Sequence, residues 1–274
     1  MAYPVTSGHP QYAGNFIPEL WSGKLIEKFY DATVLAQISN TEYEGMIKAH
    51  GDTVHIRTTP TLTIRDYVKG QTLQIERPDS TPLELLIDKG KYWQAVSDDV
   101  DKVQSDVNLM DVWSRDASEQ MKIVVDRDVL TNMLTDISAD NQGLTAGAKT
   151  ASFNLGTTAS PLTVTKDGAG GTTSITELIV DIGTVLDENN VPESDRYLVL
   201  PAKAVGLIKK SELKDASLTG DGTSIVRNGR VGMVDRFTIY ASHNLLQSGP
   251  EFNIIAGHKR GLTFASQMTK METI

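Results

Sequence analysis

The stretch YLVLPAKAVGLIKKSELKDASLTGDGTSIVRNGRVGMVDRFTIYA, residues 197–241, reads as a strand, a helix, a glycine-rich loop and a second strand. Tyr197–Leu200 is a short apolar run of the kind that forms a buried strand. Pro201 suits the first turn of a helix that runs through Leu213, because its missing N–H costs little there. Phe237–Ala241 is rich in aromatic and β-branched residues, which favour a strand. These elements predict a compact α/β unit.

The flanking residues extend this unit on both sides. Ser174 and Glu177 have the spacing of a capping box and predict a helix that continues to Asn190. Further strands are expected at Phe252–Ala256 and Leu262–Ala265. Residues 139–173 are rich in Gly, Ala, Ser and Thr, which indicates a loop with room for one small hairpin.

A long helix is predicted upstream, over residues 107–138. Apolar residues recur there at spacings of three and four, and neither Gly nor Pro interrupts the stretch. Asn108 is a plausible N-cap, and Asp111 favours the positive end of the helix. A helix of this length would extend about 48 Å at ~1.5 Å per residue, so it is expected to act as a spine.

Residues 51–96 carry the alternation of apolar and polar residues that is typical of strands. Pro60, Gly70 and Pro78 punctuate the run, and large apolar residues are sparse near its middle. This pattern predicts an extended hairpin with a solvated tip at Tyr67–Gly70. An isolated hairpin is only marginally stable in water, so we expect this one to lie on another surface. The alternating apolar residues are Val54, Ile56, Leu62, Ile64, Leu73, Ile75, Leu83, Leu85 and Ile87.

The first fifty residues read as an arm rather than a domain. Leu20, Trp21, Leu25, Ile26 and Phe29 recur at helical spacing and predict one short amphipathic helix. A single short helix cannot bury its own apolar face. It is therefore expected to pack either on the body of the same chain or on a neighbouring copy.

The composition excludes several classes of protein. The chain has 274 residues, 39% hydrophobic content and a formal charge of −9, and it contains no cysteine. Disulfides and cysteine-bound metals are thereby excluded. No apolar run is long enough for a membrane span, and the N-terminus does not resemble a secretory signal. The acidic balance argues against gripping nucleic acid through many phosphate contacts, although an acidic shell could still enclose DNA.

No catalytic or ligand-binding motif stands out in the sequence. The five histidines have no metal-binding spacing, and the acidic stretch 98–111 lacks the glycine and the glutamate of a calcium loop. Residues 167–174 precede a helix but lack the lysine of a phosphate-binding loop, and no G-x-S-x-G motif is present. A solvated helix face and a flexible loop explain these features better. We therefore predict no catalytic, cofactor-binding or metal-binding residue.

Several strings in the sequence resemble the major capsid proteins of tailed bacteriophages with the Hong Kong 97-type fold. The resemblance is strongest over residues 197–274 and extends to an amino-terminal string, FIPELWSGKLIEKFYDATVLAQISN. Its length and order make it specific, rather than any catalytic signature. The matching strings are Leu200-Pro201, Lys209–Ala216, Gly229–Tyr240, Ala256–Lys259, Leu262–Thr273 and Phe16–Asn40.

The resemblance implies an α+β fold with four parts. These are an N-terminal arm (1–50), an extended β-hairpin loop (51–96), a peripheral domain with the spine helix (97–173 and 258–274), and an axial α/β domain (174–257). Relatives usually continue with another strand beyond the position that corresponds to Ile274. We therefore expect either a smaller peripheral sheet or a shortened chain.

The resemblance also implies a function without catalysis. Copies would form hexamers and pentamers, which tile an icosahedral head around double-stranded DNA without reading its sequence. The protein would assemble in the bacterial host cytoplasm and reside in the virion, with no cofactor and no membrane. Scaffolding, portal and decoration proteins are candidate partners. The residues expected at contacts between copies are Trp21, Phe29, Tyr67, Lys69, Arg227 and Arg230.

Three other interpretations stay open from the sequence. An encapsulin-like shell would have the same fold but hold protein cargo. A small soluble α/β enzyme would place its site within residues 174–246. Another virion component, such as a decoration or tail protein, fits the order of hairpin and spine helix less well. Some relatives form covalent crosslinks through a loop lysine, but no asparagine or glutamate partner is identifiable for Lys69. A solvated lysine is therefore expected there.

Overall fold

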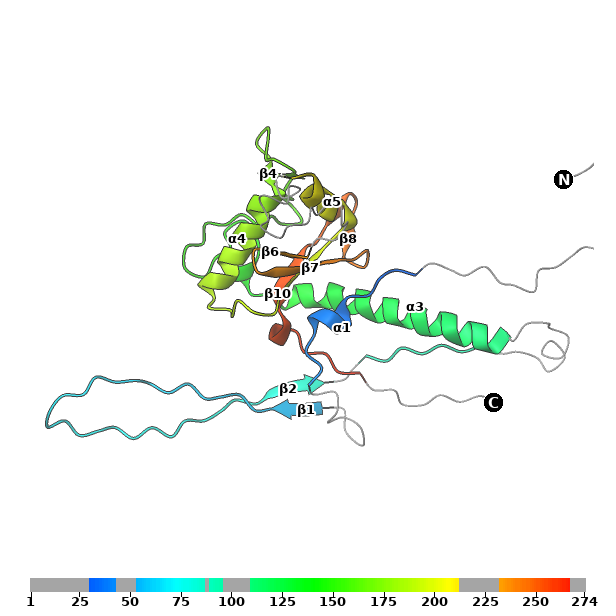
Figure 1. The fold of residues 1–274 in the computed structure, drawn as a ribbon. Coiled ribbons are helices and arrows are strands. Elements are labelled where there is room, and N and C mark those ends of the chain that lie inside the picture. The colour runs from blue at the N-terminus through cyan, green and yellow to red at the C-terminus, as the bar shows by residue number, and fades with distance from the viewer. Residues whose placement is uncertain (1–29, 43–52, 87–88, 96–108, 212–231, 267–274) are drawn as a thin grey trace, which may run out of the picture.

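A four-stranded sheet with helices on both faces forms the body of the protein, and a long hairpin projects away from it (Figure 1). The computed structural model describes residues 30–42, 53–86, 89–95, 109–211 and 232–266. The mixture of helices with parallel and antiparallel strands confirms the predicted α+β class. Within the described residues, no helix is long and apolar enough to cross a membrane.

The central strand of the sheet is the apolar run predicted from the sequence. All five residues of β5 are buried, as expected for a strand covered on both faces. β5 is parallel to β7 and antiparallel to β10, while β6 is antiparallel to β7. The sheet therefore has the order β10-β5-β7-β6. The strands are β5 (Arg196–Leu200), β6 (Met233–Val234), β7 (Phe237–Ala241) and β10 (Ile255–His258).

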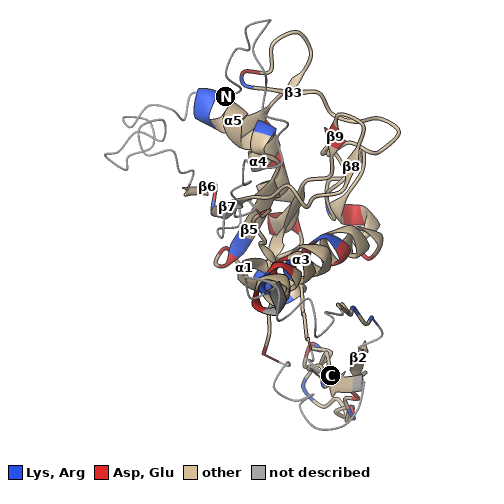
Figure 2. Cartoon of the chain, turned by 90° about the vertical axis from the view of Figure 1, so that its right-hand side faces the viewer, with Lys and Arg blue, Asp and Glu red and all other residues tan. Residues whose placement is uncertain are grey.

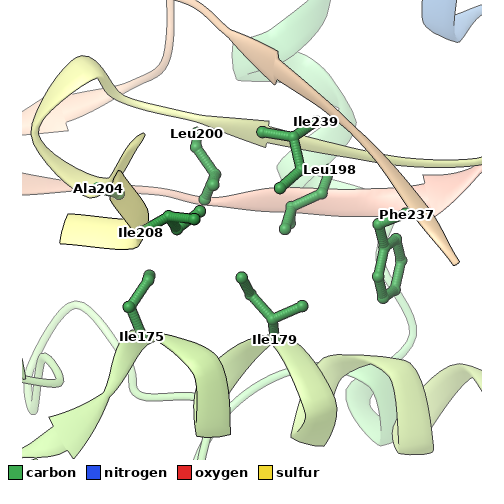
Figure 3. Packing of buried hydrophobic residues seen from close by; sticks show 8 residues of the cluster. All are labelled: Ile175, Ile179, Leu198, Leu200, Ala204, Ile208, Phe237 and Ile239. Carbon is green, nitrogen blue, oxygen red and sulfur yellow. The ribbon is translucent and has the colours of Figure 1, made fainter. Parts of the chain in front are cut away.

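One face of the sheet packs against helices α4 (Ile175–Glu188) and α5 (Ala202–Lys210). Side chains from both helices converge on alternate residues of β5 and β7, as Figure 3 shows. This core confirms the predicted α/β unit. Its buried residues are Ile175, Ile179, Leu198, Leu200, Ala204, Ile208, Phe237 and Ile239.

The other face of the sheet packs against α1 (Leu35–Ile38) and the long helix α3 (Leu109–Asn132). The described part of the predicted arm, residues 30–42, thus lies on the body of its own chain. The predicted amphipathic helix near Phe29 lies outside the described residues. The buried residues of this second core are Val34, Ile38, Leu130, Tyr197, Val199, Leu245 and Ile255.

The long helix ends earlier than its pattern predicts. α3 has 24 residues and is followed by a single 3₁₀ turn, η2 (Met133–Thr135), rather than continuing to Ser138. The Asn132 side chain donates to the carbonyl of Asp128, and the Thr135 hydroxyl donates to the carbonyl of Asn132. Such short polar side chains compete with the backbone hydrogen bonds that would extend a helix. The predicted N-cap, Asn108, lies outside the described residues.

Three smaller predictions need correction. Ser174 occupies the N-cap position of α4, but its hydroxyl bonds to the Lys166 carbonyl and to the Thr176 side chain, so no capping box forms. The strand predicted at Phe252–Ala256 is interrupted, because the N–H of Asn253 turns to the carbonyl of Leu246. Residues 262–265 form only an isolated bridge to Asn40. The remaining short elements are β3 (Val164–Thr165), β4 (Thr173–Ser174), β8 (Gln247–Ser248), β9 (Glu251–Phe252), η3 (Ala139–Asn141) and η5 (Lys259–Gly261).

Candidate interaction surface

Among the described residues, the hairpin of residues 53–86 projects away from the body of the protein (Figure 1). Its base is a four-residue antiparallel ladder between β1 (Thr53–Ile56) and β2 (Leu83–Leu86). The base lies beside Asn40, Arg260 and Thr263, with which Ile56 and Leu83 line an open groove of about 460 Å³. Segment 30–42 and the C-terminal part of the body therefore flank the hairpin where it leaves the molecule.

Beyond the base, the two arms of the hairpin keep the same register without a ladder of backbone hydrogen bonds. Thr58 Oγ1 donates to the carbonyl of Thr81, and the N–H of Thr63 donates to Glu76. Both pairs fit the register of the base, in which Ile56 lies opposite Leu83. Within residues 57–82 the one backbone-to-backbone hydrogen bond runs from Gln71 to Val68, at the tip. The strands predicted at residues 62–64 and 73–75 are therefore extended but not ladder-paired.

Prolines account for part of this missing ladder. Pro60 lies in the first arm, and Pro78 and Pro82 lie in the second. Because proline has no N–H, it cannot donate a ladder hydrogen bond. The hairpin consequently has backbone N–H and carbonyl groups that only solvent or another chain can satisfy.

The hairpin also exposes large apolar side chains. Ile64 and Ile75 are 91% and 93% exposed, and Leu62 and Leu73 are 60% and 70% exposed. Scattered apolar residues are normal on a protein surface, but a gathered set of them marks a site of interaction. The sequence revealed these four residues as strand positions, and not as members of an interface.

The turn of the hairpin forms where the sequence predicts it. Gly70 has a φ of +90°, a conformation that glycine adopts without strain. Tyr67 is 70% exposed and Lys69 is also exposed, so two predicted interface residues lie free at the tip. The other four, Trp21, Phe29, Arg227 and Arg230, lie outside the described residues.

An ion pair joins the two arms of the hairpin near its tip. Arg65 Nη2 lies 2.8 Å from Glu76 Oε1. The backbone N–H of Thr63, together with the Arg65 guanidinium, lowers the pKa of Glu76 below its ordinary value. Thr63, Arg65, Tyr67 and Glu76 line a shallow groove of about 220 Å³. Polar contacts between the arms thus fix their register where the backbone does not.

A buried carboxylate anchors the segment that precedes the hairpin. Asp126 of α3 is fully buried and accepts hydrogen bonds from the N–H groups of Val34 and Leu35, at 3.0 and 2.8 Å. Its other oxygen accepts from Asn244 Nδ2 at 2.7 Å. Because α1 has no side-chain cap of its own, Asp126 caps it from a distant part of the chain.

The described residues contain no group of three or more His, Cys, Asp or Glu side chains that could hold a metal ion. Acidic and basic residues are intermixed along α3, as Figure 2 shows, so this helix displays no patch of one sign. The hairpin, with its exposed apolar side chains and its backbone groups without a ladder, is the candidate interaction surface.

Comparison with known proteins points in the same direction. No protein-family model and no curated protein matches the sequence. Among solved structures, a chain in the structure of Mycobacterium phage Che8 is similar at 28% identity and a TM-score of 0.70, covering 93% of this chain and 85% of that one. A chain in the capsid of cyanophage P-SCSP1u has 16% identity and a TM-score of 0.60, covering 85% and 69%. A chain in the mature capsid of bacteriophage PhiM1 has 15% identity and a TM-score of 0.54, covering 89% and 78%.

The protein thus has the fold of phage capsid subunits. The shared fold extends over most of the chain.

Proposed function

We propose that this chain is the major capsid protein of a tailed phage, a shell subunit of the Hong Kong 97 type whose function is to assemble with copies of itself. The observation that carries this proposal is the projecting hairpin, with its exposed apolar residues, on a body with the phage capsid fold. An isolated two-stranded hairpin is only marginally stable in water, but it gains stability on the surface of a neighbouring copy.

In this proposal, the α/β body with its sheet, α4 and α5 supplies the axial domain. Axial domains surround the five-fold and six-fold axes of pentamers and hexamers. Helix α3 lies in the peripheral domain, and the hairpin reaches across the border between copies. The polypeptide acts as a structural subunit rather than an enzyme.

The energetics fit a shell that assembles from weak contacts. Burial of about 1,600 Å² at ~25 cal/mol per Å² gives a gross apolar stabilisation of some tens of kcal/mol. The loss of translational and rotational freedom, with the ordering of side chains, offsets most of it. Each contact can then break and reform during assembly, while the closed shell holds every subunit through several contacts at once.

The finished shell would reside in the virion and enclose double-stranded DNA. With a formal charge of −9, the subunit repels rather than binds phosphate, so DNA can fill the shell without adhering to it. Assembly would take place in the bacterial cytoplasm, with scaffolding, portal or decoration proteins as further partners.

Electron microscopy of the purified full-length protein tests this function. Closed shells, or rings with five-fold and six-fold symmetry, are the expected result. A protein that stays monomeric or dimeric at all concentrations and ionic strengths, alone and when produced inside bacteria, would contradict the proposal.

A further inference from the structure

The register of the hairpin sorts its side chains onto two faces. Because the register of β1 and β2 continues along the arms, Ile64 lies opposite Ile75, and Thr63 lies opposite Glu76. Successive residues of an extended chain point to opposite sides. Leu62, Ile64, Leu73 and Ile75 therefore share one side, which we name the apolar face; Asp66 and Arg77 lie at its two ends, opposite Leu73 and Leu62.

The other side of the hairpin is polar. Thr63, Arg65 and Glu76 belong to it, and their side chains or N–H groups already bond to one another across the arms. Tyr67 lies on the same side, next to the tip. We name this side the polar face. Its groups have partners within the hairpin, whereas the four apolar side chains are between 60% and 93% exposed.

From this division we propose that the hairpin docks on a second copy of the chain through its apolar face alone and leaves its polar face toward solvent. This inference rests on the proposed function and deepens it, because it assigns a direction to the hairpin. Docking through the polar face would require the Arg65–Glu76 pair to lose water and would leave Ile64 and Ile75 exposed, so it would be the less favourable orientation.

Charge favours a second copy as the partner. Residues 57–77 contain four basic side chains, Arg57, Arg65, Lys69 and Arg77, against two acidic ones, Asp66 and Glu76. These residues carry a formal charge of +2, whereas Asp79 and Glu84 make the whole hairpin, residues 53–86, formally neutral, so the rest of the chain carries −9. The basic outer part of the hairpin is attracted to the acidic body of another copy, and the hairpin as a whole, being formally neutral, meets no net repulsion there.

The length of the hairpin fits the same partner. From Arg57 to Lys69 one arm would span about 40 Å at ~3.3 Å per residue. A compact body of ~150 residues has a radius of gyration of about 15 Å, so its width is close to that span. The hairpin can therefore cross the body of an adjacent copy rather than only touch its edge.

Matched substitutions on neighbouring residues test the orientation. Ile75→Glu places a negative charge on the apolar face, and Gln74→Glu adds the same charge one residue away, on the polar face. Both positions are exposed in the single chain, so neither variant disturbs a core. Ile64→Glu on the apolar face and Thr72→Glu on the polar face form a second pair, here with one residue on each arm. Assembly is measured by light scattering and electron microscopy, and folding of each subunit by circular dichroism.

We expect Ile75→Glu and Ile64→Glu to lower the yield of shells at least tenfold while Gln74→Glu and Thr72→Glu assemble within about twofold of the unsubstituted protein. Equal loss in both members of each pair, or loss only on the polar face, would overturn the assigned orientation and leave the capsid function standing. If the unsubstituted protein forms no shell, the proposed function fails first. The two failures are therefore distinguishable.

Discussion

Asp126 and Asn244 lie 118 positions apart in the sequence, yet the Asp126 carboxylate accepts a 2.7 Å hydrogen bond from the Asn244 side chain in a fully buried site. The same carboxylate holds the N–H groups of Val34 and Leu35. One side chain of α3 thus joins three parts of the chain: the long helix, the segment before the hairpin, and the loop that follows β7.

Replacement of Asp126 by alanine should destabilise the subunit strongly. The change leaves the two N–H groups of α1 and the Asn244 amide buried without an acceptor. We expect a loss of about 3 kcal/mol or more in the free energy of unfolding, since each buried unsatisfied group costs ~1–3 kcal/mol. Urea denaturation followed by circular dichroism measures this loss.

Asp126→Asn is the control that separates hydrogen bonding from packing. The Asn244 Oδ1 atom is buried without a hydrogen-bond partner. A turn of the Asn244 amide would let that oxygen accept from Asn at position 126, so this variant should retain most of the stability. If Asp126→Asn is as unstable as Asp126→Ala, the negative charge rather than the hydrogen-bond pattern is essential.

Gly257 of β10 lies against the ring of Tyr197 in the neighbouring strand β5. A Cβ atom added at Gly257 would lie 2.9 Å from the Tyr197 hydroxyl oxygen and 3.1 Å from the ring carbon that bears it. Because Tyr197 is only 5% exposed, its ring has little room to move. We expect Gly257→Ala to cost about 1–3 kcal/mol by overpacking, which a lowered urea midpoint would reveal. Gly261→Ala is the matched control, since no atom lies within 4 Å of the added group.

Burial raises the pKa of Tyr197 to about 12. In the unfolded chain the tyrosine ionises near its ordinary value of about 10. The stabilisation that comes from keeping Tyr197 neutral is complete below pH 10 and declines as the pH rises to 12. The decline should amount to roughly 2–3 kcal/mol. Urea denaturation at pH 9 and pH 11 should therefore show a smaller loss for Tyr197→Phe than for the unsubstituted protein. An equal loss in both would mean that other groups cause the alkaline sensitivity.

Asp187 connects the fully buried Arg196 side chain with Arg236. Burial opposes its ionisation, but hydrogen bonds from Arg196 and Arg236 outweigh that effect and lower the pKa of Asp187. Its contribution to stability is therefore present above pH 4 and is lost as the pH falls through the lowered pKa. Asp187→Ala should cost about 3 kcal/mol at pH 7, because Arg196 is left buried without its counter-ion.

Glu193→Ala provides the control for this prediction. Glu193 pairs with the same Arg236 at 2.9 Å, but its side chain is 74% exposed. Exposed ion pairs contribute little, so this variant should unfold almost like the unsubstituted protein. If both variants lose a comparable free energy of unfolding, the loss comes from the ion pairs of Arg236 and not from the pair between Asp187 and Arg196.

The parts of the fold that were predictable are those set by local pattern. The apolar run Tyr197–Leu200 can satisfy its burial only inside a sheet covered on both faces, and β5 occupies that position. The turn near Gly70 follows from the scarcity of large apolar residues and from the glycine itself. Helices α4 and α5 begin near the signals expected for them, Ser174 and Pro201.

The parts that were not predictable depend on contacts between distant residues. Asp126 stands in the run Asp126-Arg127-Asp128, which is typical of a solvated helix face, and only the folded chain brings Val34 and Asn244 to it. The division of the hairpin into two faces could not be predicted from the sequence for a related reason. Alternation shows that Ile64 and Ile75 are strand residues, but their common side depends on the register, which β1 and β2 set far from the tip.

Trypsin should distinguish the free subunit from the assembled shell at the tip of the hairpin. Lys69 is exposed, and the arms around it have no ladder of hydrogen bonds to resist local opening. In the free subunit, cleavage after Lys69 should therefore be among the early events, as mass spectrometry of the fragments would show. Lys69→Gln removes this cleavage site and identifies the fragment that depends on it. In the proposed shell the hairpin would lie on a second copy, and a protease would have to lift several residues into its active site. Cleavage after Lys69 should then slow by at least tenfold. Shells that are cut there as fast as free subunits would mean that the hairpin remains undocked, and contacts between other surfaces would have to hold the shell together.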